Sequence, residues 1–368
     1  MARQTQAAVC RALNQPITVE ELEVESPHRD EVMVRIVAAG VCHSDLSTTN
    51  GTVPMPTPFV LGHEAAGVIE EVGEGVEDIA VGDHVVISFI MMCGECRYCV
   101  AGRPVLCDVG ARTISTLPDG TTRFKDASGA SVNQMSGVSV MSQYTTMHRN
   151  NVVKIDPEVP LDKAALVGCA VMTGVGAALN TAKVTAGSSV AVFGAGGIGL
   201  NVIQGAALAG AERIIAIDLG DKKLEFAQQF GATHTLNPER EDNVVKKIKQ
   251  LTDGGADYAF ECIGIPDVVR QAYDAVRKGG TAVVVGVSRP DASVSLGTFV
   301  MPFSEKVLTG SLYGSARPRI DFPRLLNLYK SNRLKLDELV TATYRIDEIN
   351  RAFDDMQSGV NARGVILL

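Results

Sequence analysis

The chain has 368 residues, of which 46% are hydrophobic and 21% charged, and its formal net charge is −8. This composition is typical of a globular protein with two hydrophobic cores. The acidic balance without a basic run argues against a nucleic-acid partner, and no apolar stretch approaches the roughly 20 residues of a membrane span. Because no signal-like apolar segment follows the first residues, we expect a cytoplasmic protein with reduced thiols and no membrane partner.

The first 160 residues contain short predicted strands separated by glycine and proline. Residues 31–38, 67–72 and 82–88 alternate in polarity or are rich in β-branched side chains, as half-buried strands are. This part of the chain therefore predicts a β-rich domain.

Four cysteines gather within fifteen residues of this part, namely Cys93, Cys96, Cys99 and Cys107. Two overlapping Cys-x-x-Cys steps and a fourth thiol can close a tetrahedral shell around Zn²⁺, with metal–sulfur bonds of about 2.3 Å. Disulfides are the alternative, but they are typical of short secreted chains. The spacing thus predicts a closed, structural zinc site, which carries out no chemistry.

The pattern changes after a helical stretch that begins near residue 161. Apolar strands then alternate with amphipathic helices such as 243–251, which favours a doubly wound parallel sheet. The predicted strands are 189–193, 213–217, 233–236, 258–262 and 281–287. The last residues, 364–368, have the composition of a strand that returns to the first domain.

A glycine-rich segment follows the first of these strands. Gly194, Gly196, Gly197 and Gly199 match the pattern G-x-G-x-x-G, which lets a pyrophosphate approach the backbone at the start of a helix. Asp218 follows the next strand, where a carboxylate accepts hydrogen bonds from the adenosine ribose and repels a 2′-phosphate. Turn glycines and a solvated acid are the alternative, but the strand–turn–helix context predicts NAD binding.

A second, open metal site needs ligands other than the four clustered cysteines. A shell of two cysteines and one histidine leaves one position free for a substrate oxygen. Cys42, His63 and Cys169 are candidates, although each alone is more often a core or loop residue.

Several motifs together resemble the zinc-dependent medium-chain alcohol dehydrogenases along essentially the whole chain. They are residues 62–67 (GHEAAG), the four-cysteine segment, Gly168-Cys169 with Thr173-Gly174, and the glycine-rich segment. The resemblance implies an α/β fold in which a Rossmann-type doubly wound parallel sheet is inserted into a β-rich GroES-like catalytic domain. We place the catalytic domain at 1–170 with its structural zinc lobe at 93–107, the NAD-binding domain at 171–310, and the return to the catalytic domain at 311–368.

The resemblance also implies roles for individual residues. Cys42, His63 and Cys169 would be the ligands of the catalytic zinc, Asp45 would orient His63, and Glu64 would be the acid behind the metal. Ser44 would take the substrate proton, but the family's histidine three residues further on is Ser47 here, so the end of the proton relay is open. The expected cofactor contacts besides the glycines and Asp218 are His43, Thr173, Ile198, Lys223, Val287 and Arg363. The expected substrate pocket contains Val53, Phe89 and Met135, with Val287 beside them.

These residues imply NAD-linked oxidation of primary alcohols (medium-chain, terpenoid or aromatic) to aldehydes, and the reverse, by hydride transfer from a zinc-bound alkoxide. The alternative is a thiol-dependent formaldehyde dehydrogenase acting with glutathione or mycothiol. Segment 51–58, however, lacks the acidic residues of that branch. A non-catalytic zinc protein fits less well, because an open zinc site would serve no purpose there, and a double-bond reductase of the same fold fits less well, because those relatives generally lack both zinc sites. The family further implies a homodimer or homotetramer, with strands around 295–312 pairing between subunits.

Overall fold

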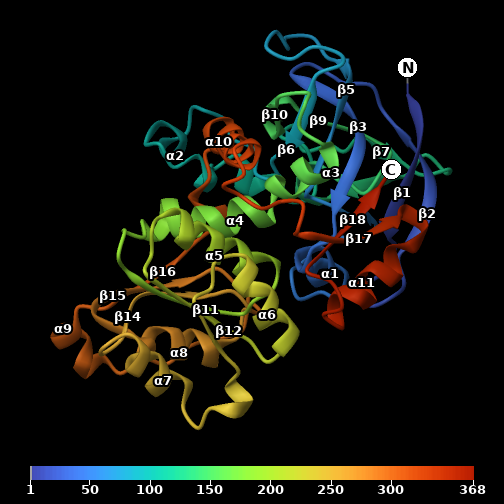
Figure 1. Ribbon diagram of the computed structural model, residues 1–368. Helices are drawn as coiled ribbons and strands as arrows, with labels where there is room; N and C mark the ends of the chain where they lie inside the picture. The colour runs from blue at the N-terminus through green and yellow to red at the C-terminus, as the bar shows by residue number, and fades with distance from the viewer. Residues whose placement is uncertain (1) are drawn as a thin grey trace. The chain divides into compact units, whose positions relative to one another are not determined.

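A computed structural model describes residues 2–368, which form two compact units (Figure 1). The first unit comprises the chain up to Cys169 together with Arg317–Leu368, and the second comprises Ala170–Ala316. Each unit has its own sheets and its own core.

The first unit contains a small closed barrel and a larger sheet. The barrel has the strand order β1 (Arg3–Cys10), β2 (Thr18–Val24), β7 (Phe124–Lys125), β8 (Ser131–Gln134) and β4 (Phe59–Val60). The seven-stranded sheet runs β10 (Val152–Lys154), β6 (His84–Ile87), β5 (Ala65–Val72), β3 (Glu31–Gly40), β18 (Arg363–Leu367) and β17 (Val340–Arg345), and β9 (Tyr144–His148) also pairs with β3. The C-terminal strand β18 pairs antiparallel with β3, which places it inside the first unit.

The predicted strands of this unit occur with small changes at their ends. Strand β3 is longer than its prediction and continues to Gly40, because Ala38 and Ala39 pair with both β5 and β18. The α-helices of this unit are α1 (His43–Thr49), α2 (Arg97–Val100), α3 (Leu161–Ala164), α10 (Pro318–Lys330) and α11 (Ile349–Gln357). Residues of β3, β5 and β6 pack with Met147, Phe353 and Ile366 in the main core of the unit.

The second unit is a doubly wound parallel sheet, which confirms the predicted fold class. Its strand order is β13 (His234–Leu236), β12 (Arg213–Ile217), β11 (Ser189–Phe193), β14 (Ala256–Glu261), β15 (Val276–Val284) and β16 (Val307–Gly310), with every pair parallel. The helices are α4 (Ala170–Gly176), which continues as a π-helix at Ala177–Ala182, α5 (Gly197–Leu208), α6 (Asp221–Gln229), α7 (Val244–Leu251), α8 (Pro266–Ala275) and α9 (Met301–Ser304). Figure 1 shows α5 on one side of this sheet and α7 and α8 on the other.

Local sequence explains several of these elements. The side chain of Asn243 accepts a hydrogen bond from the Lys246 N–H at 2.8 Å and caps α7, whose buried residues Val244 and Ile248 lie one turn apart. Strands were predicted around residues 295–312, all of which the structure describes. Of these residues only Val307–Gly310 form a strand, and Thr298–Ser304 form helical turns. Strand β15 begins at Val276, five residues before the predicted start. Glycine is unfavourable in strands, so Gly279 and Gly280 argued against a strand in this part of the sequence.

No single helix among the described residues is long and apolar enough to span a membrane. The helical segments Leu161–Gly168 and Ala170–Ala182 meet that test only when they are taken together.

Candidate active site

The first unit brings Cys42, His63 and Cys169 together as a buried cluster. Cys42 precedes α1 with extended backbone, His63 lies between β4 and β5, and Cys169 follows the short turn after α3. Their ligand atoms lie within 4.8 Å of one another, and His63 Nε2 is 3.3 Å from Cys169 Sγ. A tetrahedral zinc ion with Zn–S of about 2.3 Å and Zn–N of about 2.0 Å requires an N···S distance of about 3.5 Å. The three donors therefore fit a zinc ion with one open position.

Asp45 fixes the orientation of the His63 ring. Its Oδ1 lies 2.9 Å from His63 Nδ1, and its Oδ2 accepts the Cys42 backbone N–H at 3.2 Å. Asp45 is fully buried, so no water competes for these bonds. Because the carboxylate holds the proton on Nδ1, Nε2 is left as the metal-binding nitrogen, which is the usual arrangement of histidine ligands.

Protons are distributed unequally within the cluster before a metal binds. The hydrogen bond to Cys169 lowers the pKa of Cys42 well below its usual value, and the same bond, with burial, raises the pKa of Cys169. Burial opposes the protonation of His63, but the charge and hydrogen bond of Asp45 raise the pKa of that imidazole well above its usual value. A divalent cation would thus replace the protons of Cys169 and His63, so its binding releases protons.

Glu64 lies next to His63 in sequence and forms a buried ion pair with Arg363 of β18. A Cβ atom on Gly40 would lie 2.6 Å from the Glu64 carboxyl carbon, so the sheet needs glycine at that position to admit the acid. Arg363 is 6% exposed, and its Nε has no hydrogen-bond partner among the described residues. The predicted contact of Arg363 with the cofactor stays a prediction, and its pair with Glu64 was not predicted, because 299 positions separate the two residues.

The four clustered cysteines form the second metal-binding set. Their sulfurs lie within 4.8 Å of one another, with Cys93 and Cys99 4.0 Å apart. Backbone N–H groups of Cys96 and Cys93 donate to Cys93 Sγ and Cys107 Sγ, both at 3.3 Å. Backbone hydrogen bonds from Cys99 and Asp108 also lower the pKa of Cys96 to about 6. The backbone contacts of Cys96 favour its thiolate, whereas burial raises the pKa of Cys99 to about 12, so a zinc ion would have to displace the Cys99 proton to close the Cys₄ site.

The glycine-rich segment of the second unit has the backbone geometry of a dinucleotide site. Gly194 has φ +93°, and a Cβ on Gly199 would lie 1.7 Å from the Gly194 carbonyl oxygen, so both positions need glycine. Gly196 caps α5, and a Cβ there would meet no protein atom within 4 Å. The open space at the helix N-terminus is where a pyrophosphate would lie, and an added side chain would fill it.

Asp218 lies directly after β12 and contacts this segment. Its Oδ2 accepts the Ala195 N–H at 2.8 Å, and its Oδ1 accepts the Gly220 N–H at 2.9 Å. Each carboxylate oxygen keeps a further lone pair for a ribose hydroxyl. Lys223 of α6 is half-buried beside Gly220, where its methylenes would lie 3.5 Å from an added Cβ.

The remaining predicted residues are distributed over both units. In the first unit, the Phe89 ring meets the His63 ring edge-on at 5.4 Å, Met135 is buried, and Val53 is half-buried. In α1, His43 is exposed and Ser44 half-buried. In the second unit, Thr173 is buried in α4, Ile198 is half-buried at the start of α5, and Val287 is 67% exposed. Their roles toward cofactor and substrate stay predictions.

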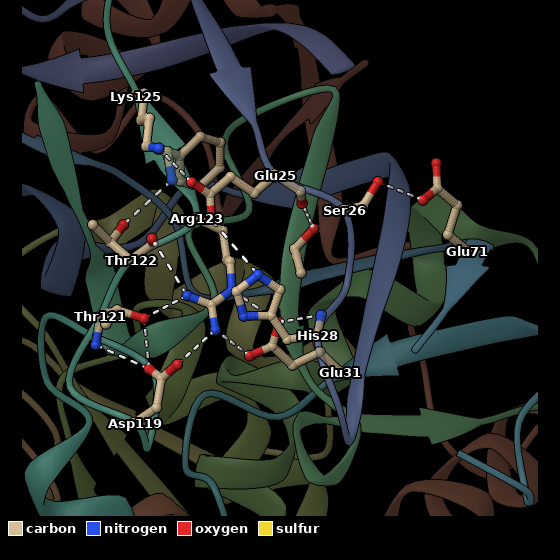
Figure 2. Close-up of polar contacts among 12 residues, drawn as sticks. Glu25, Ser26, His28, Glu31, Glu71, Asp119, Thr121, Thr122, Arg123 and Lys125 are labelled. Carbon is tan, nitrogen blue, oxygen red and sulfur yellow. Dashed lines mark hydrogen bonds and ion pairs between the residues drawn. The ribbon is translucent and has the colours of Figure 1, made fainter. Parts of the chain in front are cut away.

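A third group of possible metal ligands, His28, Glu31 and Asp119, surrounds a buried arginine (Figure 2). Arg123 is 1% exposed and donates to Glu31 at 2.5 and 2.9 Å and to Asp119 at 2.7 Å. The guanidinium already neutralises the two carboxylates, and its positive charge would repel a metal ion. This group is therefore part of an ion-pair network around the buried Arg123 and Glu31, which ties β3 to the loop before β7.

Comparison with known proteins agrees with this geometry. Residues 28–157 match the family described as the alcohol dehydrogenase GroES-like domain, and residues 197–331 match the zinc-binding dehydrogenase family. The chain is 44% identical to an NDMA-dependent alcohol dehydrogenase of Amycolatopsis methanolica, covering 99% of this chain and 98% of that one. It is 41% identical to an S-(hydroxymethyl)glutathione dehydrogenase of Saccharomyces cerevisiae, covering 98% and 95%.

Solved structures give the same result. A benzyl alcohol dehydrogenase from Acinetobacter calcoaceticus superposes with a TM-score of 0.91 at 35% identity, over 100% of this chain and 99% of that one. An alcohol dehydrogenase zinc-binding domain protein from Burkholderia ambifaria superposes with a TM-score of 0.96 at 36% identity, over the full length of both chains. With two cysteine-containing zinc sets and an NAD-type glycine segment in place, the chain belongs to the zinc-dependent medium-chain alcohol dehydrogenase family.

Proposed function

We propose that this enzyme oxidises medium-chain, terpenoid or aromatic primary alcohols to aldehydes with NAD, and catalyses the reverse reaction, without a thiol cofactor. The observation that carries the proposal is the apolar side of the Cys42–His63–Cys169 cluster, where Phe89 lies. The Phe89 ring lies against His63, and the buried Met135 packs in the same core. An apolar site with few polar groups favours the hydrocarbon part of an alcohol over a charged tripeptide.

Each of these residues of the first unit would have a separate role in the reaction. Cys42, His63 and Cys169 would hold the zinc ion, which supplies a Lewis acid that lowers the pKa of an alcohol hydroxyl. Asp45 keeps the His63 ring in place, and the half-buried Ser44 would accept the hydroxyl proton and pass it toward solvent. In the second unit, Asp218 would bind the adenosine ribose and disfavour NADP.

The alternative is a thiol-dependent formaldehyde dehydrogenase. Two relatives named S-(hydroxymethyl)glutathione dehydrogenase, at 41% and 40% identity, support it. Against it, segment 51–58 (GTVPMPTP) offers no carboxylate to the amino groups of such a cofactor. The similarity to a benzyl alcohol dehydrogenase structure favours the first proposal.

Initial rates of NADH formation distinguish the two functions. The zinc-loaded enzyme would be assayed with ethanol, butanol, octanol, geraniol and benzyl alcohol, and with formaldehyde plus glutathione or mycothiol. Each buried methylene contributes about 0.8 kcal/mol, so kcat/KM should rise by up to about fourfold per carbon until the pocket is full. The same assays would be repeated with added NDMA, because the Amycolatopsis relative is named as NDMA-dependent.

A matched pair of variants tests the role of Phe89. Phe89→Ala should widen the pocket and shift the optimum toward bulkier alcohols, whereas Phe89→Leu, which keeps most of the volume, should shift it less. Formaldehyde turnover that requires a thiol, with negligible oxidation of octanol and benzyl alcohol, would replace this proposal by the alternative. Equal kcat/KM for all chain lengths would contradict the apolar-pocket argument alone.

We also propose that the enzyme is a homodimer or homotetramer that associates through the second unit. Strand β16 lies at the edge of the six-stranded sheet, and near it Phe299 and Phe303 are 80% and 69% exposed. An apolar patch beside an unpaired strand edge is typical of a subunit interface. Light scattering after size exclusion should give a multimer that Phe303→Glu dissociates, and a monomer at every concentration would contradict this.

A further inference from the structure

A cavity of about 460 Å³ lies in the first unit, and none of its lining residues belongs to the Cys42–His63–Cys169 cluster. Its walls are the structural-zinc segment, the turn before β10 and the start of α10. All of its lining residues belong to the first unit, among them Arg149, Asn150, Val153, Arg317, Arg319 and Ile320. The volume is that of a small-molecule site, and the mechanism above does not use it.

Two of the three arginines share a single carboxylate. Arg149 lies 3.3 Å from Asp78 and Arg319 lies 3.7 Å from it, and these distances are long for charge-assisted hydrogen bonds. Arg149 also donates to the Gly75 carbonyl at 3.3 Å, and Arg319 to the Asn150 side chain at 3.1 Å. Since each guanidinium has five N–H donors, most of these donors remain available.

The third arginine is the least satisfied. Arg317 is 46% exposed at its side chain, and its guanidinium lies 3.8 Å from Asp321, beyond hydrogen-bond range. The other oxygen of Asp321 already accepts the Arg317 backbone N–H at 2.7 Å. Three guanidinium groups thus have two neighbouring carboxylates, Asp78 and Asp321, and each of these ion pairs is longer than a charge-assisted hydrogen bond.

The cysteines of the lining limit where a ligand can bind. Cys93 and Cys99 line the cavity, and four thiolates around one Zn²⁺ carry a formal charge of about −2. Backbone N–H groups offset part of this charge, since Cys96 and Glu95 donate to Cys93 Sγ at 3.3 and 3.4 Å. An anion would therefore avoid the sulfur wall and contact the arginines.

We propose that this cavity binds a small organic anion, a carboxylate or phosphate monoester that carries a short apolar group. The arginines would bind the anionic head, with Arg317 and Arg319 as the main contacts. The apolar part would contact Val153 and Ile320, and Ile320 is 58% exposed although it is a large aliphatic residue. The site is separate from the proposed alcohol-oxidising site and does not depend on it.

Calorimetric titration of phenyl phosphate into zinc-loaded, NAD-saturated enzyme tests the proposal, with NAD present to occupy the pyrophosphate site. We expect saturable binding to one site per chain, weakened by added salt and tighter than that of inorganic phosphate or phenol alone. The double variant Arg317→Gln/Arg319→Gln should weaken binding by about tenfold or more, because charge-assisted hydrogen bonds are lost. Its zinc content and thermal unfolding midpoint would be measured to show that it is folded.

The chain offers a matched control in Arg289→Gln/Arg345→Gln, two exposed arginines paired with Asp291 and Asp347. This control should bind phenyl phosphate as the unmodified enzyme does. Equal weakening in both double variants, or no saturable heat, would overturn the proposal. Competition between phenyl phosphate and benzyl alcohol in the activity assay would likewise assign the binding to the catalytic site instead. A change of oligomeric state in the double variant Arg317→Gln/Arg319→Gln, with its affinity for phenyl phosphate unchanged, would overturn the proposal. It would show that a second copy of the chain fills the cavity.

Discussion

Replacement of Asp45 by asparagine separates the charge of this residue from its shape. Asp45 satisfies two donors, His63 Nδ1 at 2.9 Å and the Cys42 N–H at 3.2 Å. Asparagine is nearly isosteric but has one acceptor oxygen, so one of these two buried donors must lose its partner. Loss of such a partner to a metal-bound histidine lowers metal affinity or activity by about 10- to 100-fold, which is about 1.4 to 2.7 kcal/mol.

The assay is a zinc competition titration with a chelator, together with kcat/KM for benzyl alcohol. We expect Asp45→Asn to lose zinc from the Cys42–His63–Cys169 cluster at lower chelator concentrations while the Cys₄ set keeps its metal. Asp45→Ala should lose more, because both donors are then unpaired, at a further cost in folding free energy of about 1–3 kcal/mol.

Asp83→Asn is the matched control, since Asp83 accepts the Ala80 N–H at 2.9 Å in the same unit and is not part of either zinc set. The control should bind zinc as the unmodified enzyme does. Zinc affinity of Asp45→Asn within about twofold of the unmodified enzyme would refute the argument, because orientation by a buried carboxylate should cost at least tenfold. Preferential loss of the Cys₄ zinc would also refute it.

The other predictions concern metal content, cofactor choice and stability. Elemental analysis should find two zinc ions per chain. Cys96→Ser should lower solubility or the unfolding midpoint, whereas Cys42→Ser should stay folded and be inactive. The opposite pattern would reverse the assignment of the structural and the catalytic zinc sites. Asp218→Gly should lower the ratio of kcat/KM with NAD to kcat/KM with NADP. It should also raise KM for both cofactors, because the carboxylate accepts the Ala195 N–H in the glycine-rich segment. Comparable kcat/KM with NAD and NADP in the unmodified enzyme would exclude a role of Asp218 in cofactor choice. Arg123→Met should lower the free energy of unfolding by about 3–5 kcal/mol in a denaturant titration, because Glu31 is then left buried without its charge partner, and added Glu31→Gln should restore part of the loss.

The short-range motifs could be predicted from the sequence because their geometry is local. The Cys93–Cys107 spacing brings four thiols onto one loop, and the glycines at 194–199 follow a strand and start a helix, whatever the rest of the chain does. Strands β11 and β12 were placed correctly because they are continuous apolar runs bounded by turns. Cys42, His63 and Cys169 were candidates for the open zinc site from the sequence, but only the resemblance to a family assigned them that role, since nothing near Cys169 in sequence indicates a metal.

Tertiary structure determined the contacts that make these motifs a site. It placed Asp45 against His63 across 18 positions, His63 against Cys169 across 106, and Arg363 against Glu64 across 299. It also placed three arginines from two distant segments around the cavity beside the zinc lobe. The physical reason is that burial and pairing of charge depend on which strands and helices pack together, and residue spacing along the chain carries no information about contacts made over such separations.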